Sequence, residues 1–237
     1  MSLVAGKNGA FYLAQYDLSG MVNRFEPSLS RGLIDGTCMG ASGHQYHPSL
    51  HDDSFSFDGF YDEGDITDAM DTLRTGTSVA VCSLCMGSTA QSKAIAGEGV
   101  WVEDYPVQVS VDDLVRATGT FKFQGLAREA YILAAKSERT ADGSATYVDD
   151  AAASSSGAEA YLHVFSCTVP DLVIKVQTDT AADFASPTDL ITFTTVTGET
   201  SERKTVTGAV ERYVRVNYAG TWTGDKTATF AVIWARL

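Results

Sequence analysis

Three histidines within eight positions are the residues whose types and spacing come closest to a metal site. Two aspartates follow at once, and the full set is His44, His47, His51, Asp52 and Asp53. Imidazole nitrogens and carboxylates are both ligands of Zn²⁺. On a helix His47 and His51 would share a face, but Pro48 disfavours the helical conformation at His47. No glutamate separates them as in the H-E-x-x-H motif. We therefore predict no metal site, and the alternative is a loop site of these histidines with Asp52 or Asp53.

The cysteines offer a second set of candidate ligands, namely Cys38, Cys82, Cys85 and Cys167. Cys82 and Cys85 form a C-x-x-C pair inside SVAVCSLCM, a stretch typical of a strand. Residues three apart in a strand face opposite sides of the sheet, so both could not bind one ion without a bulge. A zinc ribbon would also need a second such pair. We predict structural thiols, kept reduced because no export signal precedes them.

Motifs for catalysis and for cofactor binding are absent from the sequence. It has no G-x-S-x-G, no P-loop, and no G-x-G-x-x-G that leads into a helix. Carboxylates are abundant, but no pair is singled out for acid–base work. We predict that the chain is not an enzyme, has no catalytic residue and binds no cofactor.

The chain is acidic, with a formal net charge of −13 over 237 residues. A surface of this sign repels nucleic acid, so we expect no specific binding of DNA or RNA. The stretch from Gly32 to Leu73 has nine acids and no lysine or arginine. It predicts either a solubilising face or an acidic wall past which an anion moves without binding. No run of about 18 apolar residues exists, so we expect no membrane span.

Aromatic side chains in the second half could form a surface on which sugars stack. The candidates are Tyr213, Tyr218, Trp222 and Trp234. Trp234 lies in ATFAVIWARL, which is apolar on both faces, so we expect it in the core. Trp222 lies in the loop sequence GTWTGD and is the better candidate for an exposed aromatic that contacts a glycan.

The elements that must position these residues are mostly strands. In the first half we expect strands at 10–18, 21–34, 54–62, 78–87, 97–111 and 118–125. Pro27 indicates that the second of these lies at a sheet edge or carries a bulge. The Gly-rich segment 35–51 shows little periodicity, so we expect a long loop there.

One helix is expected at residues 66–75. Asp65 is its predicted cap, Arg74 lies in its last turn and Gly76 follows its end. Its apolar residues recur at helical spacing, and they are Ile66, Ala69, Met70 and Leu73.

The strand pattern divides the chain into two parts. We expect the segment 125–144 to interrupt it, and strand-like runs spaced about 10 residues apart follow the low-complexity stretch 149–160. The predicted fold is mainly β. Residues 1–128 form an antiparallel β-barrel or sandwich with one flanking helix, and residues 129–237 form a C-terminal β-sandwich. A boundary near 157 is the alternative.

Three short motifs follow one another in the first half: DLSG at Asp17–Gly20, PSLHDD at Pro48–Asp53 and GFYD at Gly59–Asp62. Their order and spacing resemble those of tail tube (major tail) proteins of long-tailed bacteriophages. Ser49 and Asp53 stand where that family's pattern has glycines. The resemblance covers about residues 8–128. The C-terminal strands resemble a β-sandwich that is appended, as a decoration domain, to phage virion proteins.

The resemblance implies a structural protein of the virion tail, made in the host cytoplasm. Such subunits form rings, usually homohexamers, and the rings stack into a tube that meets other tail proteins. DNA leaves the virion through this tube without specific binding. A tail terminator or baseplate protein would show the same resemblance. The alternative function is a glycan- or receptor-binding tail accessory module that acts through the C-terminal β-sandwich.

Within this interpretation we expect residues 36–53 to form the inter-ring loop. That loop would contain His44, His47, His51, Asp52 and Asp53. Strands near 54–61 and 97–111 are expected to line the lumen. Because histidine titrates near pH 6.5, stacking through this loop is expected to depend on pH.

Overall fold

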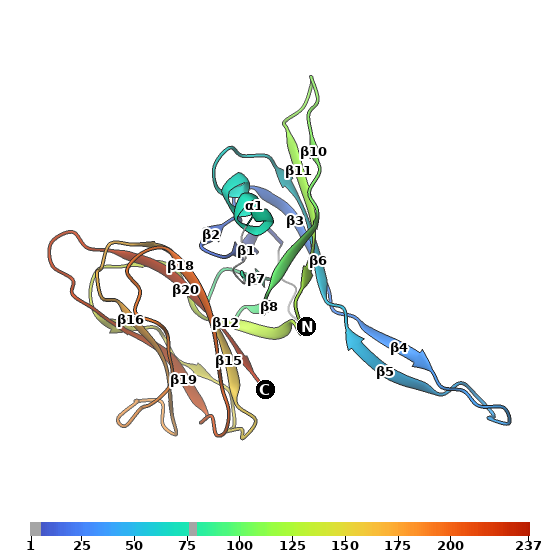
Figure 1. Cartoon of the computed structure of the whole chain (residues 1–237). Coiled ribbons are helices and arrows are strands. Elements are labelled where there is room, and N and C mark those ends of the chain that lie inside the picture. The colour runs from blue at the N-terminus through green and yellow to red at the C-terminus, as the bar shows by residue number, and fades with distance from the viewer. Residues whose placement is uncertain (1–5, 76–79) are drawn as a thin grey trace.

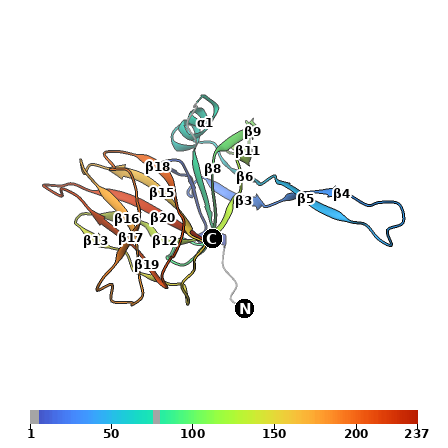
Figure 2. The same cartoon turned by 60° about the horizontal axis from the view of Figure 1, so that its bottom comes forward.

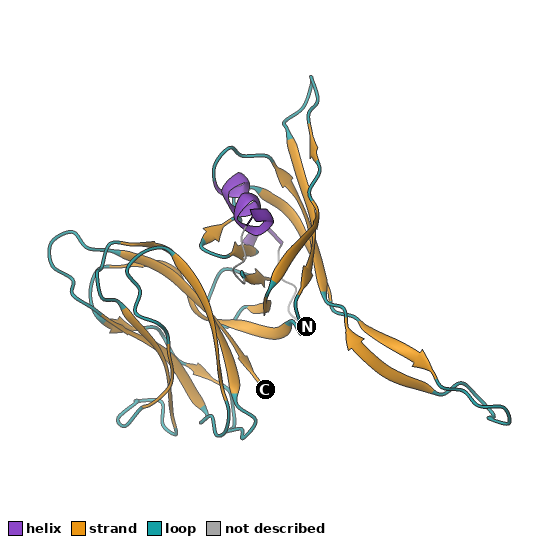
Figure 3. Cartoon of the chain, viewed as in Figure 1, coloured by secondary structure: helices purple, strands orange, loops and turns teal. Residues whose placement is uncertain are grey.

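The computed structural model describes residues 6–75 and 80–237 and consists largely of antiparallel strands. Within these ranges one α-helix accompanies the strands (Figure 3). The predicted mainly β fold class with a flanking helix is thus confirmed. Figure 1 shows a two-part body from which two hairpins project.

The elements of the first half are η1 (Gly6–Asn8), β1 (Ala10–Leu13), β2 (Tyr16–Asp17), β3 (Val22–Ser28), β4 (Arg31–Asp35), β5 (Tyr46–His51), β6 (Ser54–Phe60), α1 (Asp65–Thr75), β7 (Val81–Cys85), β8 (Lys93–Glu98), β9 (Val100–Asp104), β10 (Val107–Gln108) and β11 (Arg116–Phe123). Those of the second half are β12 (Arg128–Arg139), β13 (Gly143–Ser144), β14 (Val148–Asp149), β15 (Ala158–Cys167), β16 (Val173–Asp179), β17 (Thr188–Thr192), β18 (Thr200–Val206), β19 (Tyr213–Ala219) and β20 (Ala228–Arg236).

Three predicted strands of the first half are divided in the structure. The strand expected at 21–34 separates into β3 and β4, which belong to different sheets. The strand expected at 10–18 breaks at Ala14, whose φ of 51° lies in the left-handed region, so β1 turns back into β2. The strand expected at 97–111 breaks at Gly99, with a φ of 74°, and again at Pro106. Its residues therefore belong to the end of β8, to β9 and to β10.

One eight-stranded sheet, which we call the bridging sheet, runs through both halves in the order β18-β15-β20-β12-β8-β7-β1-β2. It curls, so that β15 contacts β7 and β2 (Figure 2). The curled face encloses a core of small and aromatic side chains from both halves, including Tyr12, Ala96, Tyr161 and Ile233. The two halves therefore share a ladder as well as a core.

The strand β12 carries this connection and corrects the expectation that 125–144 interrupts the strand pattern. It pairs with β8 of the first half on one side and with β20 of the second half on the other. Arg128, its first residue, is already bonded across to Ala96. The division into residues 1–128 and 129–237 stays a prediction.

A buried carboxylate adds to the junction between the halves. Glu159 on β15 is only 2% exposed. It accepts hydrogen bonds from Arg128 Nε (3.0 Å), Tyr161 Oη (2.6 Å) and Arg203 Nε (3.2 Å), and Arg203 also reaches Glu98 at 3.0 Å. Burial works to raise the pKa of Glu159, but these bonds and the two guanidiniums together hold it below its usual value.

A second sheet, the front sheet, covers the core of the first half. Its order is β10-β11-β6-β3, with β9 also paired to β11. The predicted helix is confirmed over Asp65–Thr75, and its four apolar residues are buried in this core. Pro27 lies in β3 at the edge of the sheet, as predicted. The predicted position of Gly76 just past the helix lies outside the described residues.

The second half contains two sheets that pack on one apolar core. Its C-terminal sheet has the order β13-β19-β16-β17, with β14 also on β19, and packs against the β18-β15-β20-β12 end of the bridging sheet. The core between them is apolar and includes Leu162, Val176, Val216 and Trp234. Trp234 is fully buried, as expected from its apolar surroundings in the sequence.

The segment 35–51, predicted as a long loop, belongs instead to a two-stranded hairpin, which we call the long hairpin (residues 31–51). Strands β4 and β5 pair with each other only, and a turn at 36–45 joins them. Figures 1 and 2 both show the long hairpin projecting away from the body.

Candidate assembly surfaces

The front sheet turns a polar face to solvent. Along β6, Phe55 and Phe57 point into the core while Ser54, Ser56 and Asp58 face outward. The neighbouring strand β11 alternates in the same way. The strand expected at 54–62 is therefore present as β6, and its alternation leaves one regular polar surface on this sheet.

Each lysine or arginine on the polar face contacts a carboxylate. The pairs are Arg24 with Glu26, Arg116 Nε with Asp113 Oδ2 at 3.4 Å, and Lys122 Nζ with both oxygens of Asp52 at 2.9 and 3.0 Å. Exposed pairs of this kind contribute only about 0–1 kcal/mol to stability. Their consequence is electrostatic, because strands β3, β6, β9 and β11 present no unpaired lysine or arginine.

Both edges of the front sheet are free within the described chain. At one edge β3 pairs only with β6, and at the other β9 and β10 pair only with β11. A free edge exposes unpaired backbone N–H and C=O groups, which are a template for a strand of another chain.

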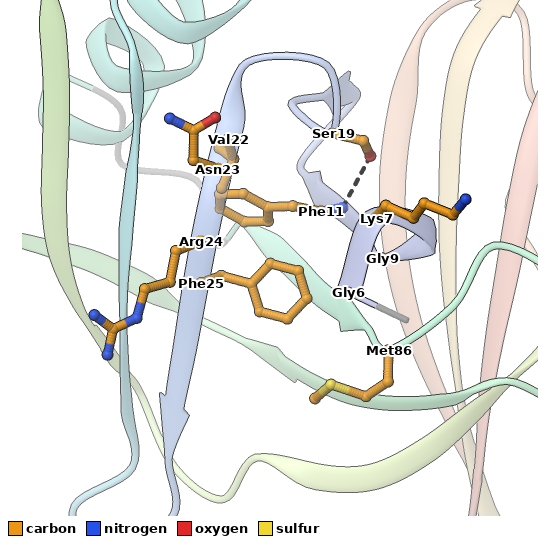
Figure 4. Close-up of a pocket in the computed structure, with 10 residues that line it drawn as sticks. All are labelled: Gly6, Lys7, Gly9, Phe11, Ser19, Val22, Asn23, Arg24, Phe25 and Met86. Carbon is orange, nitrogen blue, oxygen red and sulfur yellow. Dashed lines mark hydrogen bonds between the residues drawn. The ribbon is translucent and has the colours of Figure 1, made fainter. Parts of the chain in front are cut away.

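A cavity of about 680 Å³ opens beside the β3 edge (Figure 4). Phe11, Phe25 and Met86 supply apolar lining, and Lys7 and Arg24 also border it. The ten residues that line the cavity include no histidine, cysteine or carboxylate, so the lining provides neither an acid–base pair nor a set of metal ligands. The cavity adds apolar surface to the open edge.

The predicted histidine set is spread along the long hairpin. In β5, His47 lies across the ladder from Ile34, and His51 lies across from Arg31. In the part of the chain that is described, no group of three or more His, Cys, Asp or Glu side chains is placed to hold a metal ion. The placement of these histidines as an inter-ring contact stays a prediction.

His44 lies in the turn of the long hairpin and contacts the end of β4. Its Nδ1 is 3.1 Å from Asp35 Oδ2, and its ring stacks on Tyr46 with centroids 5.7 Å apart. Hydrogen bonds from the hydroxyl and the N–H of Thr37, and then the contact with His44, lower the pKa of Asp35. The turn is thus organised by its own polar groups.

Asp52 and Asp53 have different surroundings, although the sequence grouped them. Asp52 is exposed and binds Lys122. Asp53 is 1% exposed, and its two carboxylate oxygens accept hydrogen bonds from Ser30 N (3.0 Å) and Ala127 N (2.9 Å). Asp53 therefore ties the base of the long hairpin to the segment between β11 and β12. The expectation that Asp53 belongs to an inter-ring loop stays a prediction.

The C-x-x-C cysteines lie on opposite sides of β7, as expected for a strand. Cys82 packs into the core of the first half and Cys85 into the curled face of the bridging sheet. Burial raises the pKa of both thiols, that of Cys85 to about 12. Neither thiol is poised to act as a thiolate.

The predicted sugar-stacking surface is not assembled. Tyr218 and Trp234 are buried. Trp222, expected to be an exposed aromatic, is only half-exposed, because it packs against the sandwich core. Its indole Nε1 donates to Asp142 Oδ1 at 2.6 Å.

The nine acids of the stretch 32–73 do not form one wall. Five of them gather on and just before α1, and these are Asp62, Glu63, Asp65, Asp68 and Asp71. Only Asp58 among the nine belongs to a strand of the front sheet. The acids predicted to repel a passing anion thus lie mostly away from the polar face.

His163 is a polar residue of structural importance that the sequence reasoning missed. It is fully buried on β15, where Nδ1 lies 2.7 Å from the carbonyl oxygen of Ala14 and Nε2 lies 2.8 Å from Ser83 Oγ. A carbonyl can only accept, so Nδ1 carries the proton and Nε2 accepts from the Ser83 hydroxyl. Burial lowers the pKa of His163 to about 4. A polar side chain inside the otherwise apolar run AYLHVF was the available signal.

None of the described helices is both long enough and apolar enough to cross a membrane. No protein-family model matches the chain, and no curated protein does.

Solved structures of phage tail and tail-hub proteins are among those to which the chain is similar. A gene transfer agent virion chain matches 54% of this chain and 98% of its own length, with 12% identity and a TM-score of 0.43. The tail tube of phage SPP1 matches 53% and 78%, at 12% identity and 0.43. The SPP1 Dit hub protein matches 96% and 98%, at 12% identity and 0.37.

Proposed function

We propose that the chain is a structural, non-enzymatic protein of a phage tail. Copies assemble into hexameric rings that stack into a tube and meet other tail proteins. The polar face of the front sheet lines the lumen, and DNA passes through without specific binding. The observation that carries this proposal is a polar sheet face, free at both edges, on which every lysine and arginine is paired with a carboxylate.

The free edges supply the means of ring closure. A β3 edge on one copy and a β9 or β10 edge on the next are different surfaces of the same sheet, so their pairing is heterologous. Heterologous contacts close into rings when the rotation between copies allows it. Closure would remove the exposed edges that otherwise promote aggregation.

The paired cations explain how DNA could pass through such a ring. A protein grips DNA when lysine and arginine replace the counterions of the phosphates. On the polar face the three cationic side chains are already paired with Glu26, Asp52 and Asp113. The low affinity of the lumen for DNA would therefore come from the pairing of its lysine and arginine side chains with carboxylates, rather than from the acidic wall expected from the sequence.

Electron microscopy of concentrated purified protein, with sedimentation velocity, tests the proposal. We expect rings with a hollow centre, alone or stacked, and sedimentation well above that of the 25.3 kDa chain. Double-stranded DNA added at moderate salt should not be retained. A protein that stays monomeric at every concentration and salt tested would refute the proposal.

A further inference from the structure

Exposed apolar side chains are concentrated on the two projecting hairpins. Of the fifteen exposed large hydrophobic residues in the described chain, ten lie between residues 29 and 51 or between 107 and 114. These two segments make up a small part of the chain, so the concentration indicates contact surfaces. We use the name β10–β11 tip for residues 107–116, which run from β10 through the turn to the first residue of β11.

One face of the long hairpin is an apolar stripe. The register pairs Leu33 with Pro48 and places Tyr46 and Leu50 on the same side of β5. Leu33 is 65% exposed and Leu50 is 84% exposed. A lone two-stranded hairpin is marginally stable in water, and among the described strands this one pairs with no other sheet.

The β10–β11 tip carries a second apolar surface. Val107 lies opposite the buried Ala117, on the side of the front sheet that faces the core. Val109 and Val111 follow β10 in the chain and are 80% and 100% exposed. Leu114, shortly before β11, is 64% exposed.

The two apolar surfaces lie at opposite ends of one ladder. Strands β6 and β11 pair from Ser54 with Lys122 to Phe60 with Arg116. The long hairpin leaves the sheet before Ser54, and the β10–β11 tip extends past Arg116 (Figure 1). One copy of the chain therefore offers different apolar surfaces at its two ends along the strand direction.

We propose that the apolar stripe of the long hairpin binds the β10–β11 tip of a second copy, head to tail. This inference rests on the proposed function and names the contact by which rings stack. The charges agree with a second copy as the occupant. Arg31 at the base of the long hairpin and Asp112 at the tip are both exposed, and neither has a salt bridge within the described residues. Each can pair with the other across the contact.

The test uses one charge on each surface in the full-length protein. Leu50→Asp places a charge on the apolar stripe of the long hairpin and leaves the β10–β11 tip unchanged. Val111→Asp places a charge on the tip and leaves the long hairpin unchanged. Because both side chains are exposed, neither change costs core packing. Each variant alone should lose stacks longer than one ring in electron micrographs, with rings retained. Leu237→Asp, which charges an exposed leucine outside both surfaces, should stack as the unaltered protein does.

Mixing the two variants gives the decisive result. The intact hairpins of Val111→Asp rings can bind the intact tips of Leu50→Asp rings, so pairs of rings should appear and longer stacks should not. Normal stacking by either single variant would overturn the inference, as would a mixture that forms no pairs. If the unaltered protein forms no rings, the proposed function fails. Sedimentation velocity then tests the inference by itself: a complex that forms in the mixture of the two variants, and in neither variant alone, would support it.

Discussion

The buried imidazole of His163 should make the stability of the protein fall steeply between neutral pH and about pH 4.5. In the folded chain the neutral ring satisfies both of its nitrogens, one with Ala14 and one with Ser83. Among the described residues, Asp17 is the charged group that acts on the His163 ring, and Lys136 is bound to Asp17. Burial outweighs the attraction of Asp17, so the pKa falls from 6.5 to about 4.

The direction of the pH effect follows from the pH at which His163 binds a proton in the folded chain and in the unfolded chain. Above pH 6.5 the ring is neutral in both states, and its contribution to stability is fully present. Between 6.5 and about 4 the unfolded chain binds a proton that the folded chain does not, so the free energy of unfolding falls as the pH falls. Each pKa unit is worth about 1.4 kcal/mol, so the loss amounts to about 2.5 kcal/mol at pH 4.5.

The assay compares urea unfolding of the unaltered protein and His163→Asn at pH 7.5 and pH 4.5, at constant ionic strength. Asparagine does not titrate and can still donate to the Ala14 carbonyl. The variant should be less stable at pH 7.5, but its loss on acidification should be smaller by about 2.5 kcal/mol. An equal pH dependence in His163→Asn and the unaltered protein would refute the reasoning.

Two further predictions concern carboxylates. Asp53→Asn should lower the free energy of unfolding by about 1–3 kcal/mol, because one of the two backbone N–H groups that bind Asp53 loses its acceptor. Asp52→Asn removes a carboxylate from an exposed ion pair and should lower the free energy of unfolding by less than about 1 kcal/mol. Urea unfolding measures both changes. The combined variant Glu26→Gln, Asp52→Asn and Asp113→Asn frees the three cations of the polar face, so its assemblies should retain double-stranded DNA in a filter assay, and increasingly so as salt is lowered. Equal retention by the unaltered assemblies would contradict the role given to pairing.

Elements whose local pattern agrees with their surroundings could be predicted from the sequence. The alternation of SFSFDGF matches a sheet with one buried face, and β6 forms as expected. The helix from Asp65 has an acidic first turn and a single apolar stripe, which one core accommodates. In both cases local preference and tertiary packing point to the same structure.

The strand β12 could not be predicted because tertiary pairing overrides its composition. Its sequence REAYILAAKSER is rich in residues that favour helices. Two long neighbours, β8 and β20, nevertheless hold it in the middle of the bridging sheet. Pairing of this kind joins residues nearly 100 positions apart, and no local pattern records it.

The site residues show the same limit at the level of single side chains. His44, His47 and His51 are close in sequence, but a hairpin spreads them along its length. Asp52 and Asp53 are adjacent, yet one is exposed and the other is buried by contacts with Ser30 and Ala127. The partners that decide each role come from distant strands and turns.

The shared position of β12 has a mechanical consequence. A pull on the second half does not stretch a linker between two bodies. It loads the backbone hydrogen bonds that join β12 to β8 and to β20. A force on the second half is therefore transmitted through β12 to the strands of the bridging sheet that belong to the first half.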